Sequence, residues 1–340
     1  MQRLATAPAH VEYVVDGAPS VRAIQFLVDV LSNPTNAALL GIGALSVLAA
    51  MAGYLRYRPV QSDVQALRDA LTDYEAFLPW MLRLAVGLPL VGAGFAGYFF
   101  SPSVAAPTRI FQVAIGFLLL FGLATRAVAA VGLAGYLVGL AVHPSLVLAS
   151  EYVGGFLALL LVGSGRPSAD HLLHRVADAP NTTFGRIDPV HGAVSWFNEA
   201  IEPYRQYTPV VLRLGLGINF SILGFWEKLA NPGPALAVVE KYDLTTVVPV
   251  DPGLWVVGAG LTELAIGVLL LAGLFTRATA AVGFVVLTTT LFGLPDDPVL
   301  AHVTLFGMTS ALFVLGAGPY SIDAYIHDRG APDETPAHDV

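Results

Sequence analysis

The chain has 340 residues, of which 55% are hydrophobic and only 12% are charged. An average soluble domain carries roughly 25% charged residues, so this composition indicates an integral membrane protein. The absence of cysteine excludes disulfides, Cys-ligated iron–sulfur clusters and covalently bound haem. A net charge of −8 without a basic stripe argues against a nucleic-acid partner.

Several apolar runs reach the roughly 20 residues that a helix needs to span a bilayer. The first 36 residues lack the basic start and apolar core of a cleavable signal peptide. Residues 63–74 are polar with scattered apolar positions, which favours a short helix on the membrane surface. We place nine spans at about 37–55, 77–100, 107–125, 128–147, 150–166, 205–229, 253–274, 277–294 and 298–317.

A block of seventeen residues occurs twice in the chain. Residues 116–132 (GFLLLFGLATRAVAAVG) and 267–283 (GVLLLAGLFTRATAAVG) are identical at thirteen positions, which indicates a duplication. Each copy belongs to a group of four predicted helices, and an even number gives both groups the same orientation in the membrane. We therefore predict an all-α polytopic membrane protein with about nine transmembrane helices, arranged as two tandem, parallel four-helix bundles plus one N-terminal helix.

The predicted organisation has five parts. A nine-span topology places ten basic residues on one side and five on the other, so the positive-inside rule puts the N-terminus outside and the C-terminus in the cytoplasm of a plasma-membrane protein. The parts are an outer N-terminal segment with the extra helix and a cytoplasmic surface helix (1–76), repeat one (77–170), a cytoplasmic linker (171–204), repeat two (205–325) and a disordered acidic tail (326–340).

Each repeat carries the same polar signatures at the same helix positions. The first helix contains Leu-Arg-Leu followed by Gly-Phe, the second and third helices are joined at Thr-Arg, and the fourth is followed by Gly-x-Gly-x-x-Ser-x-Asp. A glycine pair can end a helix, and Ser and Asp are common helix caps. We interpret the following residues as structural: Arg83, Gln112, Arg126 and Asp170 in repeat one, and Arg277 and Asp323 in repeat two.

The pattern resembles the DoxX family of small four-helix membrane proteins, which includes the DoxD-type subunit of thiosulfate:quinone oxidoreductase. The resemblance covers most of 77–170 and 205–325, and the tandem arrangement departs from the single four-helix form. It implies a membrane subunit of a quinone-linked redox system, with the lipid bilayer and a redox partner subunit as partners. The second half matches best, at Arg213, Gly224, Lys228, Glu263, Gly267, Gly273, Thr276, Arg277, Gly316, Gly318, Ser321 and Asp323.

Glu263 is the strongest candidate for chemistry, because it lies about ten residues inside its predicted helix. An unpaired carboxylate at that depth costs on the order of 2.5–3.5 kcal/mol. Arg213, on an antiparallel neighbour, is expected at a similar depth. Three interpretations stay open: a structural Glu263–Arg213 pair, a proton or substrate site lined by that pair, or a Glu263 that faces a water-filled cavity while Arg213 extends to the surface.

The two repeats differ in their ionisable residues. Repeat one has Gln112 at the position of Glu263 and Tyr98 at that of Lys228. We therefore expect any site in repeat two, with Glu263 and Arg213 as the catalytic residues. The expected pocket for a substrate or quinone is lined by Gly224, Trp226, Glu227 and Lys228.

Other features are interpreted more simply. Glu151 is expected near the outer surface, solvated or at a helix N-terminus. The 21 residues by which repeat two exceeds repeat one lie within 230–252, which are either a lid over a cavity or an interfacial connector. His171 and His174 lack a third ligand, and no metal site or covalently bound cofactor is expected.

Two functions are alternatives to the quinone-linked role: a small-solute transporter or carrier, and a non-enzymatic structural partner of a membrane complex.

Overall fold

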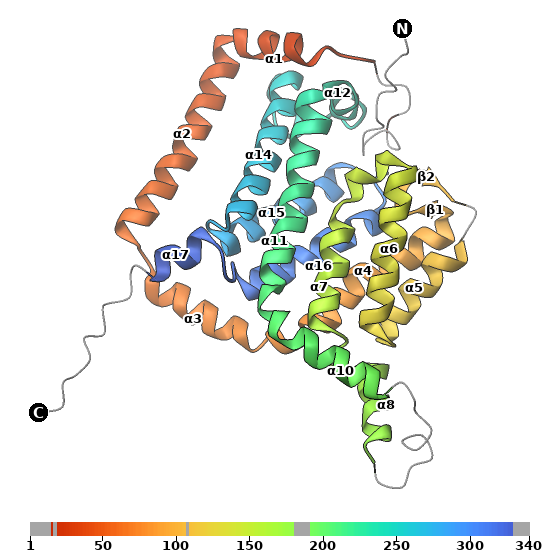
Figure 1. Cartoon of the computed structure of the whole chain (residues 1–340). Helices are drawn as coiled ribbons and strands as arrows, with labels where there is room; N and C mark the ends of the chain where they lie inside the picture. Colours follow the sequence, from red (N-terminus) through yellow and green to blue (C-terminus); the bar gives the residue numbers. More distant parts are fainter. Residues whose placement is uncertain (1–14, 16–18, 107–108, 180–190, 329–340) are drawn as a thin grey trace, which may run out of the picture.

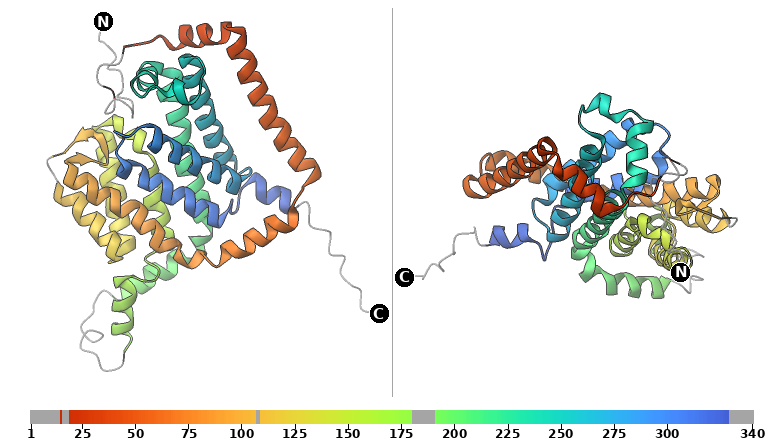
Figure 2. Two further views of the ribbon diagram at one scale, coloured as in Figure 1. Left: turned by 180° about the vertical axis from the view of Figure 1, so that it is seen from behind. Right: turned by 90° about the horizontal axis from the view of Figure 1, so that it is seen from above.

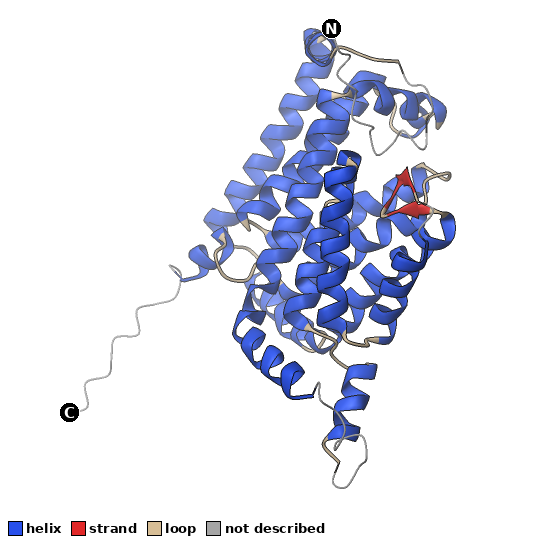
Figure 3. Cartoon of the chain, turned by 45° about the vertical axis from the view of Figure 1, so that its right-hand side comes forward, coloured by secondary structure: helices blue, strands red, loops and turns tan. Residues whose placement is uncertain are grey.

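The computed structural model describes residues 15, 19–106, 109–179 and 191–328 of the chain (Figure 1). Within these ranges the protein is α-helical except for a short antiparallel hairpin of β1 (Tyr98–Phe99) and β2 (Ser101–Ala105). Figure 3 shows this hairpin at one end of the helical bundle. The expected all-α membrane class is confirmed.

Each of the nine expected spans coincides with a helix, but the helices differ in length. Six helical stretches are long and apolar enough to cross a bilayer: Pro34–Tyr57, Gln61–Ala96, Thr125–Val142, Trp196–Ala230, Pro252–Ala272 and Thr276–Gly293. The helices in the other three expected spans are shorter, at 10–17 residues: α5 (Arg109–Phe121), α7 (Glu151–Val162) and α16 (Val299–Leu315).

The two repeats are built from helices that pack in the same order. The first helix packs on the second and fourth, and the third packs on the fourth, in both groups. Repeat one comprises α4 (Leu78–Ala96), α5, α6 (Thr125–Val142), the 3-10 helix η3 (Pro144–Ala149) and α7. Repeat two comprises α11 (Thr208–Ile222), the π-helix η5 (Leu223–Ala230), α12 (Pro232–Lys241), α13 (Leu244–Val247), α14 (Pro252–Ala272), α15 (Thr276–Gly293) and α16.

The two repeats pack against each other through their first and fourth helices: α4 packs on α16, and α11 packs on α7. Glycines allow the close approach: a Cβ on Gly154 would lie 2.9 Å from the Cα of Gly215, and one on Gly307 would collide with Ala85. Thr304 Oγ1 donates a hydrogen bond to the Ala85 carbonyl at 3.0 Å. One continuous apolar core therefore runs through both repeats.

The N-terminal helices wrap around this bundle. Helix α1 (Ala23–Ser32) packs against η5 and α14, and α3 (Gln61–Thr72) packs against α16. Helix α2 (Pro34–Tyr57) runs beside the bundle (Figures 1 and 2), and its most apolar 18-residue stretch has no buried residue. We call the end of the bundle with Asp170 and Asp323 the motif end, and the end with α1 and α12 the covered end.

Short helices complete the motif end. The 3-10 helix η2 (Glu75–Phe77) precedes α4, and α17 (Ile322–Asp328) follows α16. The expected linker contains α8 (Ala169–Ala177), α10 (His191–Ile201) and the 3-10 helix η4 (Glu202–Tyr207). The first three residues of the expected acidic tail are the end of α17, which corrects that boundary, and the remaining residues lie outside the described part of the chain.

Candidate functional site

The duplicated motif joins helix ends within each repeat. The two carboxylate oxygens of Asp170 accept hydrogen bonds from the backbone N–H of Ala124 (2.6 Å) and Thr125 (3.0 Å) at the start of α6. A carboxylate at a helix N-terminus satisfies free N–H groups and the helix dipole. Asp323 makes the same two bonds at the start of α15, to Phe275 (2.7 Å) and Thr276 (2.8 Å).

The arginine of the Thr-Arg pair caps the C-terminus of a helix. Arg126 donates to the carbonyls of Leu160 (2.9 Å) and Leu161 (3.0 Å), in the last turn of α7. The last carbonyls of a helix lack intrahelical partners and favour a positive charge. Arg277 does the same for α16, through Phe313 (3.1 Å), Val314 (3.0 Å) and Leu315 (3.3 Å).

The arginine of the first helix completes this arrangement, which we call the helix-end clamp. Arg213 is 2% exposed, and its Nη2 donates to the carbonyls of Pro319 (3.2 Å) and Tyr320 (3.1 Å). In repeat one, Arg83 donates to the Pro167 carbonyl at 2.6 Å. Each guanidinium lies against a glycine with positive φ, Gly122 or Gly273, where a Cβ would collide with it.

The expected pairing of Arg213 with Glu263 is therefore wrong. Helical side chains lean toward the N-terminus of their own helix. Arg213 sits in the second turn of α11, which starts at the motif end, so its guanidinium reaches back to the loop after α16. Arg213 belongs to the helix-end clamp, and Glu263 has another partner.

That partner is Lys228. Its Nζ donates to Glu263 Oε2 at 2.7 Å, and the two side chains are only 17% and 13% exposed. Lys228 lies on η5, a π-helix that continues α11, whereas Glu263 lies on α14. Single π-turns are rare and occur frequently at functional sites, because they change the direction of the side chains that follow.

Two glycines bring these helices close enough for the pair. A Cβ on Gly224 would lie 2.5 Å from the Gly260 carbonyl oxygen and 3.1 Å from Glu263 Cβ. A Cβ on Gly260 would lie 3.0 Å from both the Gly224 carbonyl oxygen and Lys228 Cβ. Gly224, expected in the pocket, thus acts by permitting the contact between η5 and α14.

Further charged groups surround the pair. Glu227 is buried, and both it and Asp297 act electrostatically on Lys228. The ring Nε2 of His302 lies 3.4 Å from Asp297 Oδ2, and both side chains are buried. Asp297 was not singled out from the sequence. It lies in the loop between α15 and α16, and the fold brings it to this cluster.

An apolar cover closes this end of repeat two. Helices α12 and α13 from the inserted segment pack with α1 over η5 and the start of α14. The insertion is therefore a packed structural cover. Its core consists of Phe26, Val30, Leu229, Ala235, Val238, Val239, Leu244, Val256, Val257 and Leu294.

Trp226 turns away from the pair, toward an open apolar groove. The groove has a volume of about 800 Å³, and Trp226 is 47% exposed. The hydroxyl of Ser221, in its wall, is buried and lacks a hydrogen-bond partner among the described residues. Both repeats contribute to the lining: Leu140, Pro144, Val147, Ile218, Ser221, Ile222, Phe225, Trp226, Leu264 and Leu271.

Comparison with known proteins assigns a family to this region. Residues 208–296 match the family model described as DoxX. We refer to this matched segment, residues 208–296, as the DoxX domain. Neither the curated proteins nor the solved structures include a significant match to the chain. The DoxX domain spans α11 to the loop after α15, and so contains Arg213, Arg277 and the Lys228–Glu263 pair.

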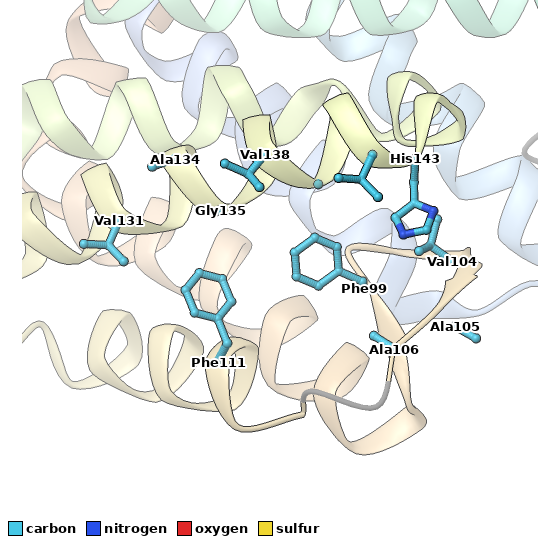
Figure 4. A pocket seen from close by; sticks show the side chains of 12 residues that line it. Phe99, Val104, Ala105, Ala106, Phe111, Val131, Ala134, Gly135, Val138 and His143 are labelled. Atoms are coloured by element: carbon cyan, nitrogen blue, oxygen red, sulfur yellow. The ribbon is translucent and has the colours of Figure 1, made fainter.

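Among the described residues, the corresponding place in repeat one has no ion pair. Gln112 Nε2 donates to the Tyr98 carbonyl (2.8 Å), and Gln112 Oε1 accepts from the Phe100 N–H (2.7 Å). Gln112 thus anchors the hairpin that replaces the π-helix of the DoxX domain. Figure 4 shows the adjoining apolar pocket of about 560 Å³, with Phe99, Phe111 and His143 in its wall.

Glu151 lies at the N-terminus of α7, which is one of its two expected positions, but it is not solvated. It is only 4% exposed and lies between α7 and the DoxX-domain helix α11, where Asn219 donates to its carboxyl group at 2.9 Å. The expected solvated position is wrong, because the contact of Gly154 with Gly215 brings α11 over the first turn of α7.

Proposed function

We propose that the DoxX domain binds a lipophilic ligand with a reducible carbonyl head, of the quinone class, at the Lys228–Glu263 pair. The protein would then be a membrane subunit of a quinone-linked redox system. The observation that carries the proposal is the pair itself, an ion pair that joins two membrane-spanning stretches. Ionisable residues within a membrane are costly and are retained mainly for function.

The chemistry of the two groups suits such a head. The Lys228 ammonium can donate a hydrogen bond to a quinone carbonyl oxygen, and Glu263 can transfer a proton to or from it. Reduction of a quinone consumes two electrons and two protons. The electrons would come from the second substrate or from a redox partner subunit.

The apolar groove suits the tail. Trp226 and Leu264 line it and are close sequence neighbours of Lys228 and Glu263, on η5 and α14 respectively. An isoprenoid tail in the groove would contact the apolar walls. Repeat one would act as a second DoxX-like bundle that supports the site without forming one.

The test is quinone analysis of purified protein. Organic extracts of the wild type, Glu263→Gln and the exposed-site control Glu240→Gln are compared for quinone per mole of protein. We expect wild type and control to agree and Glu263→Gln to lose at least about tenfold, which is about 1.4 kcal/mol of binding and on the order of one hydrogen bond to a charged group.

Equal and negligible quinone in all three proteins would contradict the proposal. A role as a small-solute carrier or as a structural partner of a membrane complex would then remain. Equal and substantial quinone in all three would place the ligand away from Glu263.

A further inference from the structure

A second buried carboxyl group lies where the two repeats meet, outside the Lys228–Glu263 site. Glu151 is the first residue of α7, and α7 runs antiparallel to α11 of the other repeat. The two helices touch at Gly154 and Gly215, where a Cβ on Gly215 would lie 2.7 Å from Gly154 Cα. One turn further toward the covered end, Glu151 meets Asn219.

Asn219 is completely buried and holds the start of α7 through its amide nitrogen. Its Nδ2 donates to Glu151 Oε2 (2.9 Å), to the Leu148 carbonyl (3.0 Å) and to Ser150 Oγ (3.3 Å). Its Oδ1 is buried and has no hydrogen-bond donor among the described residues. A buried amide oxygen without a donor is costly, so this atom calls for a proton donor beside it.

The groups around Glu151 in the described part of the chain supply no compensating cation. From α6 and α7 the titratable neighbours are Tyr136 and Tyr152, and Tyr136 donates its hydroxyl to the Leu146 carbonyl (2.7 Å). On α16, His302 is engaged by Asp297. The arginines of the packed helices α4 and α11 are Arg83 and Arg213, and both extend to the motif end.

We propose that Glu151 is a proton-binding site at the interface between the repeats. An ionised carboxylate that is buried without a cation is so unfavourable that the group takes up a proton instead. The protonated acid presents one O–H donor and one carbonyl acceptor. It can therefore donate to Asn219 Oδ1 while accepting from Nδ2, which satisfies both amide atoms with one proton.

The site links protonation to the packing of the repeats. Loss of the proton would place a full negative charge against α11, at a crossing too close to admit water. The ionised state therefore opposes the contact at Gly154 and Gly215, and the neutral state favours it. The equivalent of Glu151 in repeat two, Thr304, makes a neutral hydrogen bond to Ala85 and has no such titration.

Infrared spectroscopy of the purified full-length protein tests this directly. A protonated carboxyl group has a carbonyl stretching band that an ionised carboxylate lacks. At neutral pH, where exposed carboxyl groups are ionised, we expect this band in the wild type and in Glu263→Gln. We expect it to be absent from Glu151→Gln, which can keep a hydrogen bond to Asn219.

Asn219→Leu provides a second measurement that does not depend on Glu151→Gln folding. Loss of the hydrogen bond from the amide should move the band to higher frequency without removing it. A wild type without the band, or a band that persists unchanged in Glu151→Gln, would overturn the proposal. A band that disappears in Glu263→Gln instead would assign the proton to the other site.

Discussion

At the motif end, Asp170 and Asp323 each accept two backbone hydrogen bonds from the start of the third helix of their repeat. At the covered end, Gln112 holds a hairpin, whereas Glu263 holds Lys228 on a π-helix. Repetition thus preserves the bonds that join helix ends, because both bundles need them to fold. The covered end, which does not carry this motif, holds the Lys228–Glu263 ion pair in repeat two and the neutral Gln112 at the equivalent place in repeat one.

The comparison distinguishes two kinds of buried charged residue. A charged residue that is repeated in both halves satisfies backbone groups, as Arg83 and Arg213 do. Lys228 and Glu263 are charged in one half only, and they bond to each other rather than to backbone groups. The second kind is where function is expected, and the following substitutions test that division.

The largest effect should come from adding a methyl group to the helix-end clamp. Gly122→Ala and Gly273→Ala each place a Cβ in the space of a guanidinium, at a φ of +66° or +64°. We expect each to lower the free energy of unfolding by about 4 kcal/mol, since strain and overpacking add. Thermal unfolding in detergent measures this, and equal losses in both repeats are expected.

Gly258→Ala is the matched control for Gly273→Ala. Gly258 lies within α14, the helix that Gly273 caps, and a Cβ there would meet nothing within 4 Å. A loss at Gly273 with none at Gly122 would contradict the equivalence of the two clamps.

The next largest effect should come from Lys228→Met. It leaves the Glu263 carboxylate buried without a cation, and breaking a buried ion pair costs about 3 kcal/mol or more. Replacing both residues, in Lys228→Met with Glu263→Leu, should recover most of that loss, because an apolar pair needs no desolvation. A double-mutant cycle of unfolding free energies measures the coupling.

Lys241→Met is the control, since Lys241 is the other lysine of the chain and lies on the cover. A double mutant no more stable than Lys228→Met would show that the pair does not account for the loss.

A smaller loss of stability is expected from a substitution that gives repeat one the residue found in repeat two. Gln112→Glu keeps an acceptor for the Phe100 N–H but removes the donor to the Tyr98 carbonyl. Leaving that carbonyl opposite a carboxylate should cost about 2 kcal/mol. Glu263→Gln, the reverse change in repeat two, should cost less, because an amide oxygen can still accept from Lys228. We expect the melting temperature of Gln112→Glu to lie below that of Glu263→Gln, and the opposite order would contradict the prediction.

The sequence predicts the helices well but their side-chain partners poorly. Apolar runs and Gly-x-Gly stops give the helix positions, since both depend on local chain chemistry. The partner of Glu263 depends on where η5 turns Lys228, and a π-helix leaves no distinct local signature. Arg213 was expected at the same depth as Glu263. Its long side chain instead extends over more than one helical turn toward the N-terminus of α11, so the guanidinium lies away from Glu263.

The burial of Glu151 also could not be predicted from its local sequence. Its position at the start of an apolar segment predicts exposure, because helix ends in membranes usually meet water. Burial follows only from the crossing of α7 with α11, which joins residues of different repeats. The signal that was present in the sequence is Asn219, a polar residue in an otherwise apolar stretch of α11.

The smallest effect should come from the charges on the surface of the cover. Lys241 Nζ lies 2.9 Å from Asp296 Oδ2, and the Tyr242 hydroxyl donates to the same oxygen at 3.0 Å. The hydrogen bond from Lys241 lowers the pKa of Asp296, and the bond to Asp296 raises the pKa of Lys241. The pair is therefore ionised, and its stabilisation complete, between the ordinary pKa values of about 3.9 and 10.4.

Stabilisation by this pair is lost as the pH falls through the lowered pKa of Asp296 or rises through the raised pKa of Lys241. Because both side chains are substantially exposed, water and salt screen the attraction. Asp296→Asn should leave the melting temperature at neutral pH within experimental error of the wild type, in contrast to Lys228→Met. A clear loss in Asp296→Asn would show that the cover depends on its surface charges, rather than on the apolar contacts of Phe26, Val30 and Val239 beneath it.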